Sequence, residues 1–156
     1  MDYRWWVFIH LAGVLGMLGS HGVSMVALFR LRKERDRERI DNLLQLSGST
    51  VVPLYVSIVL LFVGGLADAI KFQYWKQLWI WLSIVLLVAS IGLMTAIATP
   101  YYKRVREATA MRPSGVPRTS DEELEALLTS RRSIATAAIG FATLAVILYL
   151  MIFKPA

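Results

Sequence analysis

Four apolar runs, each about 20 to 25 residues long, divide this chain of 156 residues. They cover residues 5–29, 51–70, 75–98 and 134–153. An α-helix rises about 1.5 Å per residue, so each run is long enough to cross the roughly 30 Å hydrocarbon core of a bilayer. Hydrophobic residues make up 56% of the chain and the mean hydropathy is +0.55, which a soluble domain of this size would have trouble hiding from water. The sequence therefore predicts an all-α, polytopic membrane protein with a bundle of four transmembrane helices.

Basic residues lie mainly in the two longer connecting segments. Thirteen of the seventeen Lys and Arg residues follow the first or the third apolar run, three lie in the other flanking segments, and Lys76 lies at the start of the third run. Because Lys and Arg are enriched in cytoplasmic loops, we expect both termini outside the cytoplasm, in a single membrane domain of residues 1–156. The net charge of +6 follows this pattern and favours contact with anionic lipid headgroups. Residues 30–39 mix Arg with Glu and Asp and lack aromatic side chains, which argues against nucleic-acid binding.

The first connecting segment carries a helix signal of its own. Residues 31–47 have a helix-forming composition, and Ile40, Leu43 and Leu44 recur on one side of an otherwise charged helix. We expect this segment to continue the first span and then to lie along the cytoplasmic interface. Gly48 is the predicted end of this helix.

The second connecting segment, residues 101–133, contains a break and a helix start. We expect Pro100 to stop the third helix near the membrane surface, because proline removes a backbone hydrogen bond and clashes with the preceding turn. Ser120 followed by Glu123 forms a capping box. A short helix through Leu128 is therefore predicted before the last span.

The only two histidines of the chain lie in the first apolar run. At about 100° and 1.5 Å per residue, His10 and His21 fall within roughly 20° of each other on a helix and about 16 Å apart along its axis. Gly13, Met17 and Ser24 lie along the same stripe. Ionisable side chains are rare inside membranes and often mark functional sites, although a histidine can also simply hydrogen-bond to a neighbouring helix.

A stripe of small residues runs beside the histidines. Ala12, Gly16, Ser20 and Ser24 recur at intervals of four, which allows another helix or a flat ligand to approach the backbone closely. Plain helix packing, within the bundle or between subunits, also explains this pattern. We expect a homodimer through the first span.

The leading functional hypothesis is b-type haem binding by the first span. The pattern is similar to that of membrane b-type cytochromes, in which one helix offers two histidines on one face to two haems. The chain has no cysteine, and a bis-imidazole site needs two histidines per iron, so His10 and His21 would each face their own symmetry mate in a parallel dimer. The predicted cofactor-binding residues are His10, Gly13, Gly16, Met17, Ser20, His21 and Ser24.

Copper handling is an alternative hypothesis for the function of the same helix. Met17, His21 and Met25 recur at intervals of four and form a row of soft ligands suited to Cu(I). A third possibility is a non-catalytic membrane subunit or scaffold, in which the histidines and glycines serve packing and no cofactor binds. The sequence identifies no catalytic residue, substrate or redox partner, and no cluster of nucleophile, base and orienting group points to a hydrolase.

Asp68 is the one acidic residue within the apolar runs. It follows Gly64-Gly65 near the outer end of the second run, at a depth that could approach His10. A carboxylate that accepts the imidazole N–H would be a suitable partner to orient a ligating histidine. A position in headgroup water is the other interpretation.

The first run resembles a known helix pattern. The residues from His10 through Gly19, Ser20 and His21 to Arg30 are similar to the first helix of small bacterial four-helix membrane proteins related to the copper-resistance protein D and membrane protoporphyrinogen oxidase families. That helix reads His, six residues, then Trp-x-Gly-Gly; His10 and Gly19 match, whereas Met17 replaces the Trp and Ser20 the second Gly. The resemblance implies a helical bundle in a bacterial inner membrane, with the first histidine as a haem ligand or near a copper path.

Overall fold

The structure is a computed structural model, and it describes residues 2–155. Within these residues no strand forms, and Met111 and Pro117 make one isolated antiparallel bridge. The elements are α1 (Tyr3–Leu31), α2 (Arg37–Ser49), α3 (Val51–Lys71), the 3-10 helix η1 (Tyr74–Lys76), α4 (Leu78–Thr109), α5 (Asp121–Leu128) and α6 (Arg131–Phe153). The all-α prediction is confirmed.

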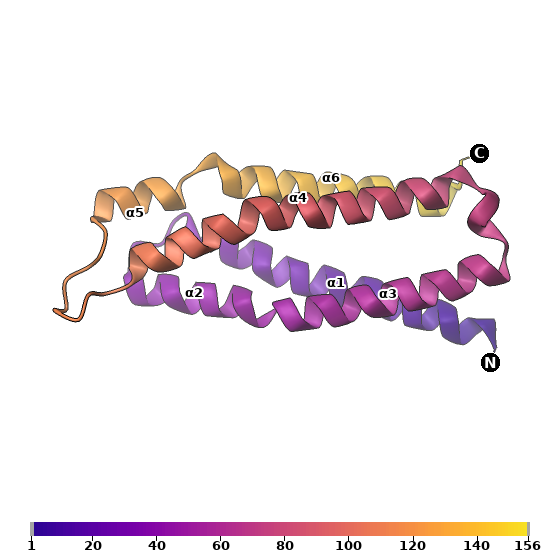
Figure 1. Ribbon diagram of the computed structural model, residues 1–156, viewed down its shortest axis with the longest axis horizontal. Helices are drawn as coiled ribbons and strands as arrows, with labels where there is room; N and C mark the ends of the chain where they lie inside the picture. The colour runs from indigo at the N-terminus through magenta and orange to yellow at the C-terminus, as the bar shows by residue number, and fades with distance from the viewer. Residues whose placement is uncertain (1, 156) are drawn as a thin grey trace.

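Four helical segments are long and apolar enough to cross a membrane, as the sequence predicts. They comprise α1, α2 with α3, α4, and α5 with α6. Figure 1 shows these segments side by side along one axis, with both chain termini at one end and α2 and α5 at the other. We call these the terminal end and the loop end. The loop end is the one that the basic residues predict to be cytoplasmic.

The long helices associate as two antiparallel pairs, α1 with α3 and α4 with α6. Figure 1 shows that α1 and α3 cross, so that α1 approaches the second pair toward the loop end. Met17 of α1, Leu61 of α3 and Leu87 of α4 are buried together in the centre of the bundle. This cluster joins the two pairs in the apolar part of the molecule.

The expectation that residues 31–47 continue the first span is wrong. α1 ends at Leu31, and α2 begins after a turn in which Asp36 is the N-cap, its carboxylate accepting a hydrogen bond from the backbone N–H of Arg39 at 3.0 Å. α2 runs back beside α1, passes Gly48 and leads into α3 along the bundle axis (Figure 1). The polar cap at Asp36 thus starts a separate helix that extends the second span.

The loop end has a compact apolar core outside the longest apolar runs. Its buried residues come from four helices: Leu28, Leu31, Ile40, Leu44, Tyr101, Val105, Ala108, Leu124 and Leu128. Ile40 and Leu44, the apolar side predicted for the first connecting segment, are 0% and 2% exposed and face this core. Full burial of an aliphatic side chain contributes about 1.5–3 kcal/mol, so this core stabilises α2 and α5 against the long helices.

Pro100 does not stop the third helix, contrary to the expectation. α4 continues through it to Thr109. A proline in a helix interior costs about 3 kcal/mol. The turns that follow bury Tyr101, Val105 and Ala108 on one face against the loop-end core, and this packing outweighs that cost.

The helix predicted after Ser120 is confirmed. α5 covers Asp121–Leu128, and the Ser120 hydroxyl accepts a hydrogen bond from the backbone N–H of Glu123 at 3.3 Å. The cap satisfies one of the backbone donors at the start of α5.

Arg37 links α2 to the segment between α4 and α5. Its guanidinium donates hydrogen bonds of 2.7 Å to the carbonyl oxygens of Ala108 and Thr119 and to the carboxylate of Asp121. The Arg37 side chain is 14% exposed. A charge that the sequence explains only as a topology signal therefore also positions the loop before α5.

Candidate functional site on the first helix

Glycines allow the backbones of α1 and α3 to touch. A Cβ atom at Gly13 would lie against the backbone nitrogen of Leu61 and 2.7 Å from the carbonyl oxygen of Ser57. At Gly64 a Cβ atom would lie 2.7 Å from the carbonyl oxygen of Trp6. This is the close helix approach that small residues permit in membranes. The expected close contact of the first span with another helix therefore occurs inside the chain.

The ring of His10 packs on α3. Its Nδ1 atom donates a hydrogen bond of 2.8 Å to the carbonyl oxygen of Leu61, because a carbonyl oxygen can only accept. A Cβ atom at Gly65 would lie 2.9 Å from Nδ1 and 3.1 Å from Cε1 of this ring. The imidazole thus occupies the space that the missing side chain of Gly65 leaves.

The ring of His21 packs on the second helix pair. Its Nε2 atom lies 2.9 Å from the position of a Cβ atom at Gly140 of α6, and the terminal methyl of Met94 from α4 lies 3.3 Å from the same point. Within residues 2–155 the ring of His21 forms no hydrogen bond, unlike that of His10. His21 therefore contacts α6 and α4 mainly through packing.

Both histidines leave one stripe of α1, yet they meet different helices. The crossing of α1 and α3 explains this difference, since the early turns of α1 lie on α3 and the later turns approach α4 and α6 (Figure 1). His10 and His21 therefore do not share one environment. The spacing along the helix is as the sequence predicts, but the surroundings are not equivalent.

The other predicted site residues are divided among several contacts. Gly16 lies against the Ser57 side chain, at 3.2 Å between its Cβ position and the Ser57 Cβ atom. The hydroxyl of Ser24 lies 2.7 Å from that of Thr50, in a hydrogen bond between α1 and the start of α3. Ser20 is half-buried, beside Gly19, whose Cβ position meets nothing within 4 Å. The predicted homodimer through this helix stays a prediction.

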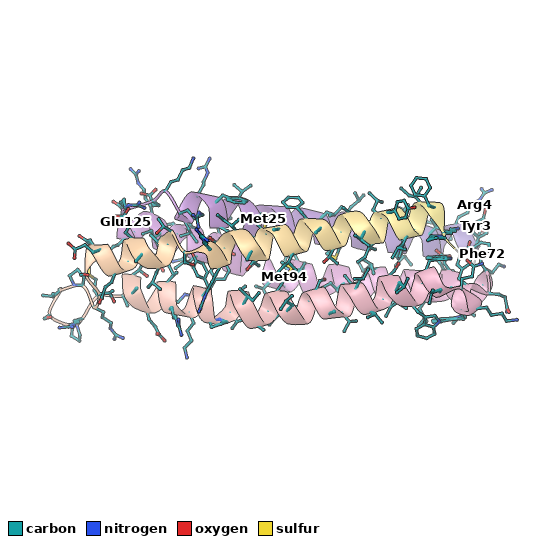
Figure 2. The ribbon with its side chains drawn as sticks, turned by 90° about the horizontal axis from the view of Figure 1, so that it is seen from above. Tyr3, Arg4, Met25, Phe72, Met94 and Glu125 are labelled. Carbon is teal, nitrogen blue, oxygen red and sulfur yellow. The ribbon has the colours of Figure 1, made fainter. Side chains whose placement is uncertain are left out.

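The methionines that could serve as soft ligands come from two helices. Met17 and Met25 are buried, 8% and 6% exposed, and Met17 packs in the central apolar cluster. Figure 2 shows Met25 and Met94 at about the same level along the bundle axis, on separate helices. Met94 was not among the residues that sequence reasoning selected, although it contacts the space at Gly140 into which His21 points.

Asp68 does not accept the Nδ1 hydrogen bond of His10. That bond goes to the carbonyl oxygen of Leu61, which fixes the orientation of the ring. The Oδ1 atom of Asp68 is buried and has no hydrogen-bond partner within residues 2–155. The side chain as a whole is only partly buried, so the headgroup interpretation stays a prediction.

Sequence reasoning missed the glycines that receive the two rings. Gly65 was visible only as part of a Gly-Gly pair, and Gly140 only as a single glycine in the last apolar run. Which glycine faces which histidine depends on how the helices pair, and no local pattern specifies that. Among residues 2–155, no group of three or more His, Cys, Asp or Glu side chains is arranged to hold a metal ion.

Comparison with known proteins identifies a family but no activity. The model of the family described as predicted integral membrane protein (DUF2269) matches residues 5–155, so the chain belongs to that family. No curated protein and no solved structure matches the chain significantly. These comparisons give no support to the resemblance to copper-resistance protein D.

Proposed function

We propose that this member of a family of integral membrane proteins is a structural membrane subunit, in which the histidines of α1 join the helices of the bundle. One observation carries the proposal: each ring lies over a glycine of a different helix, His10 over Gly65 and His21 over Gly140. Each imidazole fills the space that a side chain on the facing helix would otherwise take. The pair thus ties α1 to both halves of the bundle.

The physical basis is the weakness of hydrophobic association inside lipid. Lipid tails are as apolar as leucine, so helices in a membrane associate through close packing and hydrogen bonds between them. His10 supplies both, because its ring packs on Gly65 and donates to the carbonyl oxygen of Leu61. An interhelical hydrogen bond of this kind contributes about 0.6–2 kcal/mol in a membrane protein.

The contacts of the histidines do not favour haem. A bis-imidazole site across a dimer requires His10 to face its symmetry mate, whereas its ring packs on Gly65 of α3 in the same chain. His21 is turned toward Gly140 within the same chain. A porphyrin at either position would have to displace these helix contacts. Haem binding stays a prediction that a spectrum can test.

Copper(I) is the second candidate, and a specific contact favours it. The Nε2 atom of His21 and the methyl of Met94 both approach Gly140, and imidazole and thioether are ligands suited to Cu(I). Met25 is buried at a similar level along the axis (Figure 2). In this hypothesis Met94 of α4 is a soft ligand in place of Met17, which packs in the central apolar cluster.

One preparation distinguishes these functions. The protein is purified in detergent, its absorption spectrum is recorded oxidised and reduced, and its metal content is measured by mass spectrometry. The structural role predicts a colourless, metal-free protein. It also predicts that His10→Ala and His21→Ala remain folded and are less stable to heat.

Two results contradict the structural role. A Soret band that disappears in His10→Ala or His21→Ala, while circular dichroism still shows a folded helical protein, assigns haem binding to α1. Stoichiometric Cu(I) that is lost in Met94→Leu, with the fold retained, assigns copper handling instead. Met17→Leu is the matched methionine control, because Met17 packs in the central apolar cluster.

A further inference from the structure

An open cavity lined by polar and apolar side chains lies at the loop end, between α4, α5 and the start of α6. Its volume is about 460 Å³. The polar residues that line it are Tyr101, Arg104, Thr119, Glu123, Ser130 and Arg132. None of these residues belongs to the histidine contacts of α1. The cavity is therefore a separate feature of the molecule.

Two buried hydroxyl groups beside this cavity lack partners. Tyr101 is 4% exposed, and its hydroxyl makes no hydrogen bond to any of residues 2–155. The Ser130 hydroxyl is likewise buried without a partner in the described chain. Buried polar groups are nearly always satisfied in native proteins, so each exception asks for an explanation such as a bound group. Tyr101 and Ser130 both line the cavity, and their hydroxyl oxygens lie beneath its surface.

The cavity has an excess of positive charge. Arg104 and Arg132 line it, and neither forms an ion pair within the described part of the chain; Glu123 contributes one carboxylate. Arg32 lies beside it and donates hydrogen bonds of 2.6 Å to the carbonyl oxygen of Ser130 and 2.7 Å to the Ser133 hydroxyl. The charges favour an anionic ligand.

The N-terminus of α6 adds to this preference. Ser130 is the N-cap of this helix, but its side chain makes no capping hydrogen bond. The first backbone N–H groups of a long helix attract anions through their free donors and the helix dipole. Here that helix end coincides with two arginines and two unpartnered hydroxyls.

The cavity lies where the apolar runs end. Tyr101 follows the third run, residues 75–98, by three positions, and Arg132 precedes the fourth run, residues 134–153, by two. In a bilayer this level is that of the lipid phosphates. We infer that the cavity binds a phosphate group, held by the two guanidinium groups and the hydroxyls of Tyr101 and Ser130. An anionic phospholipid headgroup is the source that this position favours, and free phosphate has the same chemistry.

Native mass spectrometry of the full chain, purified in a mild detergent, tests the inference. The protein is mixed with phosphatidylglycerol or phosphatidylcholine, and the retained lipid is counted. We expect wild type to retain phosphatidylglycerol preferentially. In Arg104→Gln/Arg132→Gln the affinity for phosphatidylglycerol should fall about tenfold or more, because charge-assisted hydrogen bonds to the phosphate are lost. Arg106→Gln/Arg112→Gln is the matched control, since it removes the same charge from exposed positions outside the cavity.

Tyr101→Phe distinguishes loss of binding from loss of folding, because it removes only the unpartnered hydroxyl. We expect it to bind less phosphatidylglycerol while its melting temperature is unchanged or higher. In a second arm, inorganic phosphate is added without lipid, and protection against heat that is lost in Arg104→Gln/Arg132→Gln but not in the control identifies free phosphate as the ligand. The inference is overturned if the cavity variants and the control pair behave alike with both probes.

Discussion

The imidazole of His10 lies so close to Gly65 that a single methyl group there would meet its Nδ1 atom at 2.9 Å. The same ring donates a hydrogen bond of 2.8 Å to the carbonyl oxygen of Leu61, one turn earlier in α3. The glycine and the histidine therefore form one contact between two helices. A side chain added at Gly65 would displace the His10 ring, and loss of the ring N–H would weaken the contact of His10 with α3.

Gly65→Ala should lower stability by about 1–3 kcal/mol, because the ring must shift and its hydrogen bond to Leu61 weakens. Denaturation of the purified protein in mixed micelles measures the change. Gly19→Ala is the control, since a Cβ atom there meets nothing within 4 Å and alanine favours a helix. Equal losses in the two variants would show that the His10 contact is not what Gly65 serves.

Gly13→Ala should be more severe than Gly65→Ala. The added methyl would meet the backbone of Leu61 and the carbonyl oxygen of Ser57, and a backbone cannot rotate away as an imidazole can. We expect a loss of about 3 kcal/mol or more, at the upper end for overpacking, or failure to fold. Gly22→Ala, with an open Cβ position, provides the comparison on the same helix. The prediction is checked by whether Gly13→Ala melts at a lower temperature than Gly65→Ala.

Arg37→Gln should loosen the segment between α4 and α5. The change removes the donor to the carbonyl oxygens of Ala108 and Thr119, which costs about 1–3 kcal/mol for partly buried groups. Arg35→Gln is the matched control, because the Arg35–Glu125 pair is 49% and 53% exposed and contributes about 0–1 kcal/mol. Hydrogen exchange in residues 110–120 should rise in Arg37→Gln only. A similar rise in both variants would contradict the assigned role.

Glu34 should make the turn between α1 and α2 sensitive to acid. The backbone N–H groups of Arg35 and Asp36 hold the pKa of this carboxyl below its usual value. A lowered pKa in the folded state stabilises the fold above the unfolded pKa, and this contribution is lost as the pH falls through the folded pKa. The melting temperature of wild type should therefore fall more steeply in acid than that of Glu34→Gln. Parallel curves would argue against these hydrogen bonds in solution.

The sequence located the four spans because span length and hydropathy are local properties. It also identified the capping box at Ser120, since a cap depends on residues three positions apart. It misplaced the end of the third helix at Pro100, because burial of Tyr101 and Val105 in a core made of four helices outweighs the local preference. The separate start of α2 at Asp36 was missed although the capping residue was visible.

The sequence by itself determined that the protein is a helical membrane bundle, and that its two histidines share one stripe of the first helix. Hydrophobic burial in lipid and the helical repeat are enough for both conclusions. Only the tertiary structure decided that His10 contacts Gly65 and that His21 contacts Gly140. The reason is that glycine contacts set the crossing of α1 and α3, and this crossing turns the two ends of one stripe toward different helices.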